Sequence, residues 1–341
     1  MLFSWFNFII YLLLSIITLV TLLIAVAYFT LAERKIIASV QRRKGPEIVG
    51  FYGLLQPLAD GLKLVIKEMI IPTFSNKILF VFSPFLTLIL SFSGWVIIPH
   101  SLDSYIVDLN LSLLYVLAVS GLGVYGILLA GWASNSKYAL LGGLRSVAQM
   151  ISYEVSIGLT IIPILILSGS LNLIDIVFIQ SNSVWYCFPL FPLCIIFFIS
   201  ILAETNRSPF DLPEAEAELV AGYNVEYSSI IFAMFFLGEY GNILLMSALY
   251  ILFFFGGWDF FNFNSELIFS LKIVVVVFLF IFVRANLPRY RFDQLMVLGW
   301  KIFLPLTLGF IFFVTGFLMS INALKIKQLH FFNILGSISL A

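Results

Sequence analysis

Eight long apolar stretches constrain the fold of this chain more than any other feature of its sequence. They lie near residues 6–32, 78–99, 112–133, 148–168, 186–203, 227–254, 268–284 and 302–322. A helix of about 20 such residues crosses the ~30 Å hydrocarbon core of a bilayer. Hydrophobic residues make up 62% of the chain and charged residues 11%, unlike soluble domains, which are about 45–50% apolar and 25% charged. We predict an all-α, polytopic membrane protein of about eight transmembrane helices, with residues 1–341 forming one integral membrane domain.

The charged residues between these stretches predict an orientation. Loops after the first, third, fifth and seventh helices hold 15 of the 18 lysines and arginines, whereas loops after the second, fourth and sixth hold none and carry acids instead. Cytoplasmic loops are enriched in basic residues. Both termini are therefore predicted to lie outside, and the odd-numbered loops on the cytoplasmic or matrix side. The first stretch lacks a basic leader and a cleavage site, so we expect it to be a retained helix.

Residues 54–71 differ from the spanning stretches. Apolar side chains recur along one face, while Gln56, Asp60, Lys63 and Lys67 share the opposite face. The segment is too short and too charged to span a bilayer. It is predicted to be an amphipathic helix at the membrane interface.

Carboxyl groups at membrane depth are the main candidates for chemistry. Glu154 is expected about one turn into the fourth helix and Glu239 near the middle of the sixth. An acid in the bilayer costs roughly 2.5 kcal/mol or more, so such residues more often mark ion or proton paths than structural contacts. Residues 204–222 form an acidic loop on the basic side of the membrane, where close carboxylates would titrate together as a proton reservoir.

The remaining composition excludes some functions. Eighteen basic and 18 acidic residues balance, which argues against a nucleic-acid partner. The chain contains no CxxC motif and no clustered histidine and cysteine ligands. If the protein takes part in redox chemistry, we expect other chains to hold the metal centres. Basic juxtamembrane residues near 33–35, 42–46 and 284–291 suit a docking surface for a soluble partner as well as anionic lipid.

Six motifs resemble subunit 1 of respiratory complex I. They are, in order along the chain, residues 32–35 (AERK), 43–46 (RKGP), 53–60 (GLLQPLAD), 145–154 (RSVAQMISYE), 203–214 (AETNRSPFDLPE) and 284–291 (RANLPRYR). The resemblance implies a membrane subunit of proton-translocating NADH:ubiquinone oxidoreductase, in the mitochondrial inner membrane or, alternatively, a bacterial plasma membrane. It implies ubiquinone as substrate, flavin mononucleotide and iron–sulfur clusters on partner subunits and none on this chain, contacts with hydrophilic and membrane-arm subunits, and surrounding phospholipid.

The resemblance also implies roles for individual residues. Those expected around the quinone chamber and its entrance are Arg34, Arg43, Asp60, Lys63, Glu204, Arg207, Asp211, Phe236 and Arg284. Those expected along an acidic proton or coupling path are Glu154, Glu204, Glu214, Glu216, Glu218 and Glu239. No residue of this chain is expected to be redox-active. A secondary transporter or channel, and the related subunit of a membrane-bound hydrogenase, are the alternatives; the absence of visible inverted repeats disfavours the transporter.

Overall fold

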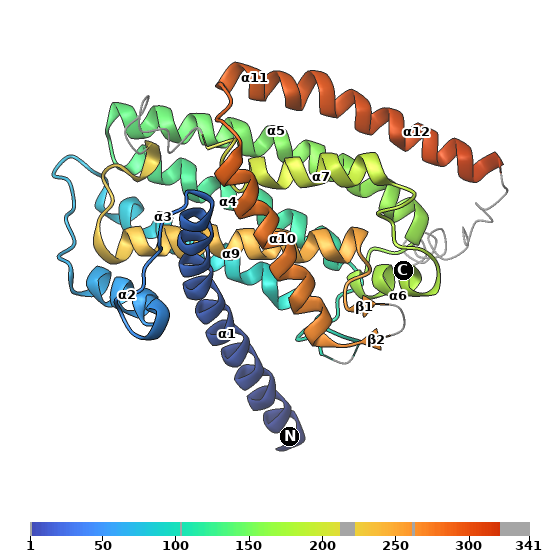
Figure 1. The fold of residues 1–341 in the computed structure, drawn as a ribbon, viewed down its shortest axis with the longest axis horizontal. Helices are drawn as coiled ribbons and strands as arrows, with labels where there is room; N and C mark the ends of the chain where they lie inside the picture. Colours follow the sequence, from blue (N-terminus) through green and yellow to red (C-terminus); the bar gives the residue numbers. More distant parts are fainter. Residues whose placement is uncertain (1, 103, 212–221, 261–262, 321–341) are drawn as a thin grey trace, which may run out of the picture.

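The computed structural model describes residues 2–102, 104–211, 222–260 and 263–320, which form an α-helical membrane protein (Figure 1). In the described part, seven helices are long and apolar enough to span a membrane. They include α1 (Leu2–Val40), α3 (Lys77–Ser93), α4 (Ser112–Ala133), α5 (Lys137–Ser168), α9 (Ser229–Phe254), α10 (Glu266–Asn286) and the helical run from α11 to α12. The prediction of an all-α polytopic protein is confirmed.

The fifth predicted span, residues 186–203, corresponds to a shorter helix, α7 (Phe191–Glu204). It begins five residues later than expected because the chain first makes a turn in which the Cys187 N–H donates to the Phe254 carbonyl (3.0 Å), and Pro192 then occupies the first helical turn. Most of α7 is buried between α5 and α9 rather than facing lipid. Another short helix, α6 (Leu173–Asn182), precedes it.

Two helices extend beyond their predicted boundaries, which corrects the positions of several charged residues. Helix α1 continues to Val40, so Arg34 is helical rather than in a loop. Helix α5 begins at Lys137, so Arg145 is helical as well, and Glu154 lies near the middle of a 32-residue helix rather than one turn from its start. Hydropathy locates the apolar part of a helix, but a helix can continue past the bilayer through polar residues.

Helix α9 crosses the middle of the molecule, with α1, α3, α7 and α10 packed against it (Figure 1). Every residue from Ile243 to Phe254 is buried, as expected for a helix surrounded by protein rather than lipid. Helices α4 and α5 approach closely where Gly131 faces Ala139 and Gly143. The approach is possible because Gly131 has no side chain; a Cβ there would collide with the Ala139 carbonyl.

Short helical turns and one pair of strands lie between the long helices. A 3₁₀ turn, η1 (Phe51–Gly53), leads into α2 (Gln56–Ile66). A second, η2 (Gly94–Ile97), follows α3, and a third, η3 (Gly222–Asn224), precedes α9. Strands β1 (Asp259–Phe260) and β2 (Phe263–Asn264) pair antiparallel between α9 and α10. Helix α11 (Phe292–Val297) continues through a π-helical segment, η4 (Leu298–Phe303), into α12 (Leu304–Ser320).

Helix α2 confirms that residues 54–71 contain a helix, although a shorter one than expected. Its apolar side chains are exposed: Leu58 and Leu62 show about 61% and 62% of their surface. An amphipathic helix exposes such a face when lipid or another protein is meant to cover it. Its position at the membrane interface stays a prediction.

Candidate functional site

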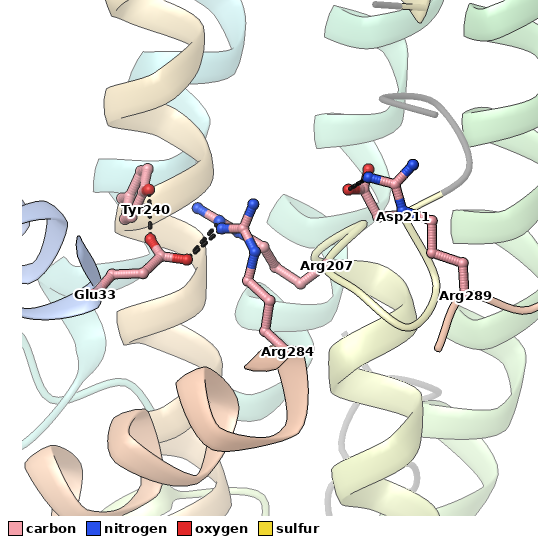
Figure 2. A network of polar contacts seen from close by, with 6 residues as sticks. All are labelled: Glu33, Arg207, Asp211, Tyr240, Arg284 and Arg289. Carbon is pink, nitrogen blue, oxygen red and sulfur yellow. Dashed lines mark hydrogen bonds and ion pairs between the residues drawn. The ribbon is translucent and has the colours of Figure 1, made fainter. Parts of the chain in front are cut away.

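A buried carboxylate, Glu33 on α1, is the centre of the site (Figure 2). Its Oε1 accepts hydrogen bonds from Arg207 Nη1 (3.1 Å) and from Arg284 Nη1, and its Oε2 accepts one from the Tyr240 hydroxyl (2.6 Å). The four residues come from α1, the segment after α7, α10 and α9. One carboxylate therefore holds together four parts of the chain that are distant in sequence.

Arg207 is the least exposed cation of this cluster, with its side chain 12% exposed. Its guanidinium lies 4.3 Å from the centre of the Tyr240 ring, a cation–π contact. Burial opposes the charge, but Tyr240 and Glu33 hold the pKa of Arg207 above the ordinary value for arginine. Arg207 is thus a permanent cation, and Glu33 is the counter-ion that allows it to be buried.

The segment after α7 is held in place by neutral contacts as well. The Gln149 side chain on α5 donates to the carbonyls of Ala203 (2.7 Å) and Phe210 (2.8 Å). The Phe210 ring stacks on Tyr290 at 5.6 Å between ring centres, and the Tyr290 N–H donates to the Pro209 carbonyl (3.0 Å). These contacts fix the described start of the acidic loop between α5 and the segment after α10.

Asp211 is the residue directly after Phe210. It is buried, and its carboxylate lies 3.6 Å from Arg289, which is half exposed (Figure 2). The loop's own arginine, Arg207, therefore pairs with Glu33 on α1, while an arginine from beyond α10 pairs with the loop's Asp211. From the sequence alone, Arg207 would be expected to pair with the acids that surround it in its own loop.

Beside the Glu33 cluster lies a second group of acids, around a cavity of about 70 Å³. Glu204 at the end of α7 and Glu239 on α9 both line it, together with Tyr223, whose hydroxyl donates to Glu239 Oε1. Glu204 is buried, and its Oε2 has no hydrogen-bond partner among the described residues. A buried polar atom without a protein partner next to a cavity is a place for water or a proton.

Glu154 continues this group. It lies against Gly121 of α4, and it interacts electrostatically with Glu204. Gly121 has no side chain, and a Cβ there would be 2.7 Å from Glu154 Oε1. The structure therefore brings Glu154, Glu204 and Glu239, which are 50 and 35 residues apart in sequence, into one region inside the helices.

The residues predicted at the entrance are more exposed. Arg34 and Asp60 form an ion pair (2.7 Å), and Gln56 donates to the other oxygen of Asp60 (2.9 Å). Lys63 is exposed on α2 and Arg43 on the segment after α1. Phe236 lies one turn before Tyr240 on α9, with ring centres 6.4 Å apart, so it is near the Glu33 cluster.

Three of the predicted path residues, Glu214, Glu216 and Glu218, lie outside the described residues. Of the described site residues, Arg207 and Arg284 both donate hydrogen bonds to Glu33. Glu33 was not among the predicted site residues. The structure also adds Tyr240, Tyr223 and Arg289. The available signal for Glu33 was an acid at the end of an apolar stretch, directly before two bases in the motif at 32–35. The tyrosines had no such signal, because apolar helices contain many aromatic residues.

In the described residues, no group of three histidine, cysteine or acidic side chains is placed to hold a metal ion. The site consists of fixed charges, buried acids and small cavities, which can bind and orient a polar headgroup and hold or move protons.

Comparison with known proteins shows the family of the chain. Residues 13–315 match the NADH dehydrogenase family. This chain belongs to that family. It is 58% identical over 324 residues to NADH-ubiquinone oxidoreductase chain 1 of Chondrus crispus, covering 92% of this chain and 99% of that protein. It is 57% identical over 307 residues to an NADH-quinone oxidoreductase subunit from Rhodospirillum rubrum, covering 88% and 91%. Chain 1 of Arabidopsis thaliana is 58% identical over 306 residues, covering 88% of this chain and 94% of that protein.

The resemblance seen in the sequence motifs is thus confirmed. The family members come from algae, plants and bacteria, and the helices are those of a multi-pass membrane protein. The chain is a subunit of an oxidoreductase complex in a mitochondrial inner membrane or a bacterial plasma membrane, and other subunits of that complex are its partners.

Proposed function

We propose that this chain is the quinone-site subunit of a proton-translocating NADH:ubiquinone oxidoreductase, and that its buried charges couple quinone reduction to proton movement. The observation that carries the proposal is the proximity of two groups, the Glu33–Arg207–Arg284 cluster and the acid-lined cavity, because Arg207 of the first interacts electrostatically with Glu239 of the second. Tyr240 of the cluster and Glu239 of the cavity are neighbours on α9, so the two groups share one helix.

The proposed entrance lies between α1, α2 and α9. Asp60, Lys63 and Phe236, with Arg34 and Arg43 nearby, would receive a quinone from the bilayer through the exposed apolar face of α2. Arg207, Arg284, Glu204 and Asp211 would border the chamber that leads inward. Arginines suit this place because a permanent cation stabilises the negative charge that develops on a reduced headgroup.

The proposed coupling begins with the chemistry of the quinone. Reduction to quinol takes up two electrons and two protons. The electrons would come from an iron–sulfur cluster on one of the partner subunits, which also carry the flavin mononucleotide. A transient negative headgroup, or withdrawal of protons, changes the field on Glu204 and on the acidic loop, which includes Glu214, Glu216 and Glu218. Because like-charged carboxyls titrate together, the change passes to Glu154 and Glu239.

The orientation predicted from the loops supports this arrangement. The Glu33 cluster lies at the end of α1 and α10 that carries Arg34, Lys35, Arg289 and Arg291. With the positive-inside rule, that end faces the matrix or cytoplasm, where a hydrophilic partner would dock. Both termini would then face the intermembrane space or periplasm.

Replacement of Glu239 by glutamine in the assembled complex tests the coupling path. Glutamine keeps the size of the side chain but removes its exchangeable acid. We expect NADH:quinone reductase activity and proton translocation to fall by about 100-fold, the lower end of the range for losing a proton-transferring group. NADH oxidation by an artificial acceptor should be unchanged, because it does not use this chain. Glu214→Gln should behave in the same way.

The matched control is Glu47→Gln, an exposed acid whose nearest cation is Lys44 at 3.7 Å. Its quinone reductase activity should match that of the native complex. Normal quinone reductase activity and proton translocation in both the Glu239 and Glu214 variants would refute the proposed path.

A further inference from the structure

A larger cavity, of about 530 Å³, lies between α1 and α10 and shares no lining residue with the acid-lined cavity. These two helices form its walls. Leu244 of α9 and Trp95 of η2 form its floor. Its volume is within the ~300–1,000 Å³ of pockets that bind small molecules.

The cavity exists because α1 and α10 are close at one end and apart at the other. They meet at the Glu33–Arg284 ion pair and separate toward the beginning of α10 (Figure 1). On α1 its lining runs from Thr18 to Ala32. At 1.5 Å per residue this is about 21 Å, longer than the ~15 Å of one bilayer leaflet and comparable to an extended acyl chain.

Polar groups are concentrated at the wide end. His100, Glu266 and Ser270 line the cavity there, whereas toward the Glu33 cluster the lining is apolar apart from Tyr28, with Ala25, Phe29 and Val277 among it. Glu266 is the first residue of α10, at the level where a spanning helix meets the headgroups. The cavity thus has the polarity of a lipid: a polar end at the interface and an apolar length within the membrane.

The charge at the polar end selects among headgroups. Glu266 is the only charged side chain in the lining, and no lysine or arginine of the described residues lines it. Burial holds the pKa of His100 below its ordinary value, even though Glu266 opposes this, so His100 is neutral near pH 7. Lys272, the nearest cation along α10, donates instead to the carbonyls of Phe255, Gly257 and Asp259.

We propose that this cavity binds one phospholipid with a primary-amine headgroup, its ammonium donating to the Glu266 carboxylate and one acyl chain lying between α1 and α10. A carboxylate accepts strong hydrogen bonds from an N–H cation. A quaternary amine has no N–H to donate, and an anionic headgroup without an amine would bring its phosphate beside Glu266 with no cation to balance either charge. The chain would fill the gap that the diverging helices leave and support α1 close to Glu33.

The test uses the intact complex, purified in mild detergent. A photoactivatable phosphatidylethanolamine is added, and labelled peptides of residues 266–277 are quantified by mass spectrometry, while extracted lipids are counted per complex. Glu266→Lys reverses the charge at the polar end, and Ala25→Phe fills the apolar length. We expect labelling to fall about tenfold in each variant, because Glu266→Lys removes one charge-assisted hydrogen bond and Ala25→Phe removes the space for the acyl chain.

Asp175→Lys is the matched control, because Asp175 is an exposed acid in the first turn of α6 and does not line the cavity. Its labelling should equal that of the native complex. Unlabelled phosphatidylethanolamine should compete for the cavity, whereas phosphatidylcholine and phosphatidylglycerol should not. Equal labelling in all variants would overturn the proposal. So would an absence of labelling in the native complex, or recovery of an anionic lipid or quinone from the cavity instead. None of these outcomes depends on quinone reductase activity.

Discussion

At the scale of single residues, Glu33 has the largest consequences. Two arginines and a tyrosine hydroxyl converge on its carboxylate, whose side chain is 7% exposed. A buried ion pair contributes little net stability when compared with an apolar pair, but removal of one partner leaves the other charge buried without compensation. The position is therefore intolerant of any side chain that lacks a negative charge.

Replacement of Glu33 by glutamine tests this reasoning. Arg207 would stay charged and buried without a counter-ion, so we expect a loss of about 3–5 kcal/mol in stability. Less assembled complex should accumulate, and its thermal inactivation should occur at a lower temperature. Glu33→Asp, which keeps the charge, should recover part of the loss. Wild-type thermal stability of the Gln variant would show that Glu33 does not balance the two arginines.

The residue scale also shows the limits of sequence motifs. Arg34, Arg207 and Arg284 could be named as candidates because each falls in a motif that resembles the family. Their partners could not, because pairing depends on how the helices pack. Arg34 pairs with Asp60, whereas Arg207 and Arg284 share Glu33.

At the scale of elements, the end of α9 is capped by a side chain from α10. Lys272 Nζ donates to the carbonyls of Phe255 (2.7 Å), Gly257 (2.9 Å) and Asp259 (2.6 Å), and it lies 4.9 Å from the centre of the Trp185 ring. Carbonyls at a helix C-terminus lack partners within the helix, and a cation there also complements the helix dipole. Lys272 thus joins α9, α10 and the turn before α7.

We expect Lys272→Met to lower the stability of the complex by about 1–3 kcal/mol, because buried carbonyls would lose their donors while the apolar bulk remains. The measurement is the midpoint of thermal inactivation. Lys67→Met, at an exposed position after α2, is the control and should leave the midpoint unchanged. An equal midpoint for the Lys272 and Lys67 variants would remove the capping role.

Hydropathy predicted the existence and order of the long helices but not where they end. Helix α5 begins 11 residues before its apolar stretch, because Gly142 packs against the backbone of Gly222 and Gly143 faces Gly131. Such close contacts stabilise a polar, glycine-containing start that hydropathy alone places in a loop. Helix α7 is shorter than its apolar stretch for the opposite reason: Trp185 and Cys187 contact the end of α9 instead of extending the helix.

At the scale of the whole molecule, the asymmetric loops and the ion cluster make one prediction about orientation. We expect an epitope at the N-terminus to be digested by protease added to the outer side of mitochondria with opened outer membranes, or to right-side-out bacterial vesicles. An epitope inserted at residue 44 should be protected until the membrane is broken, because that loop carries Arg42, Arg43 and Lys44 on the matrix or cytoplasmic side. The reverse pattern of protection would invert the topology.

The class of protein could be predicted from sequence, because lipid imposes long apolar helices, and candidate site residues could be named because any acid at membrane depth is conspicuous. The arrangement of the site could not. Glu204 and Glu239 come together because α3, α4, α5, α7 and α9 contribute to one cavity, and Glu154 joins them through its interaction with Glu204. No spacing in the sequence encodes which helices are neighbours.

The ion cluster around Glu33 also has a consequence for biosynthesis. Arg207 is translated 174 residues after Glu33, and Arg284 comes 251 residues after it. When α1 leaves the ribosome, its carboxylate has neither cation, and the adjoining Arg34 and Lys35 favour keeping that turn among the lipid headgroups. The cluster closes only after the penultimate long helix has been inserted. A nascent chain that stops before α10 would expose a half-neutralised acid, a recognisable mark of an unfinished subunit for membrane quality control.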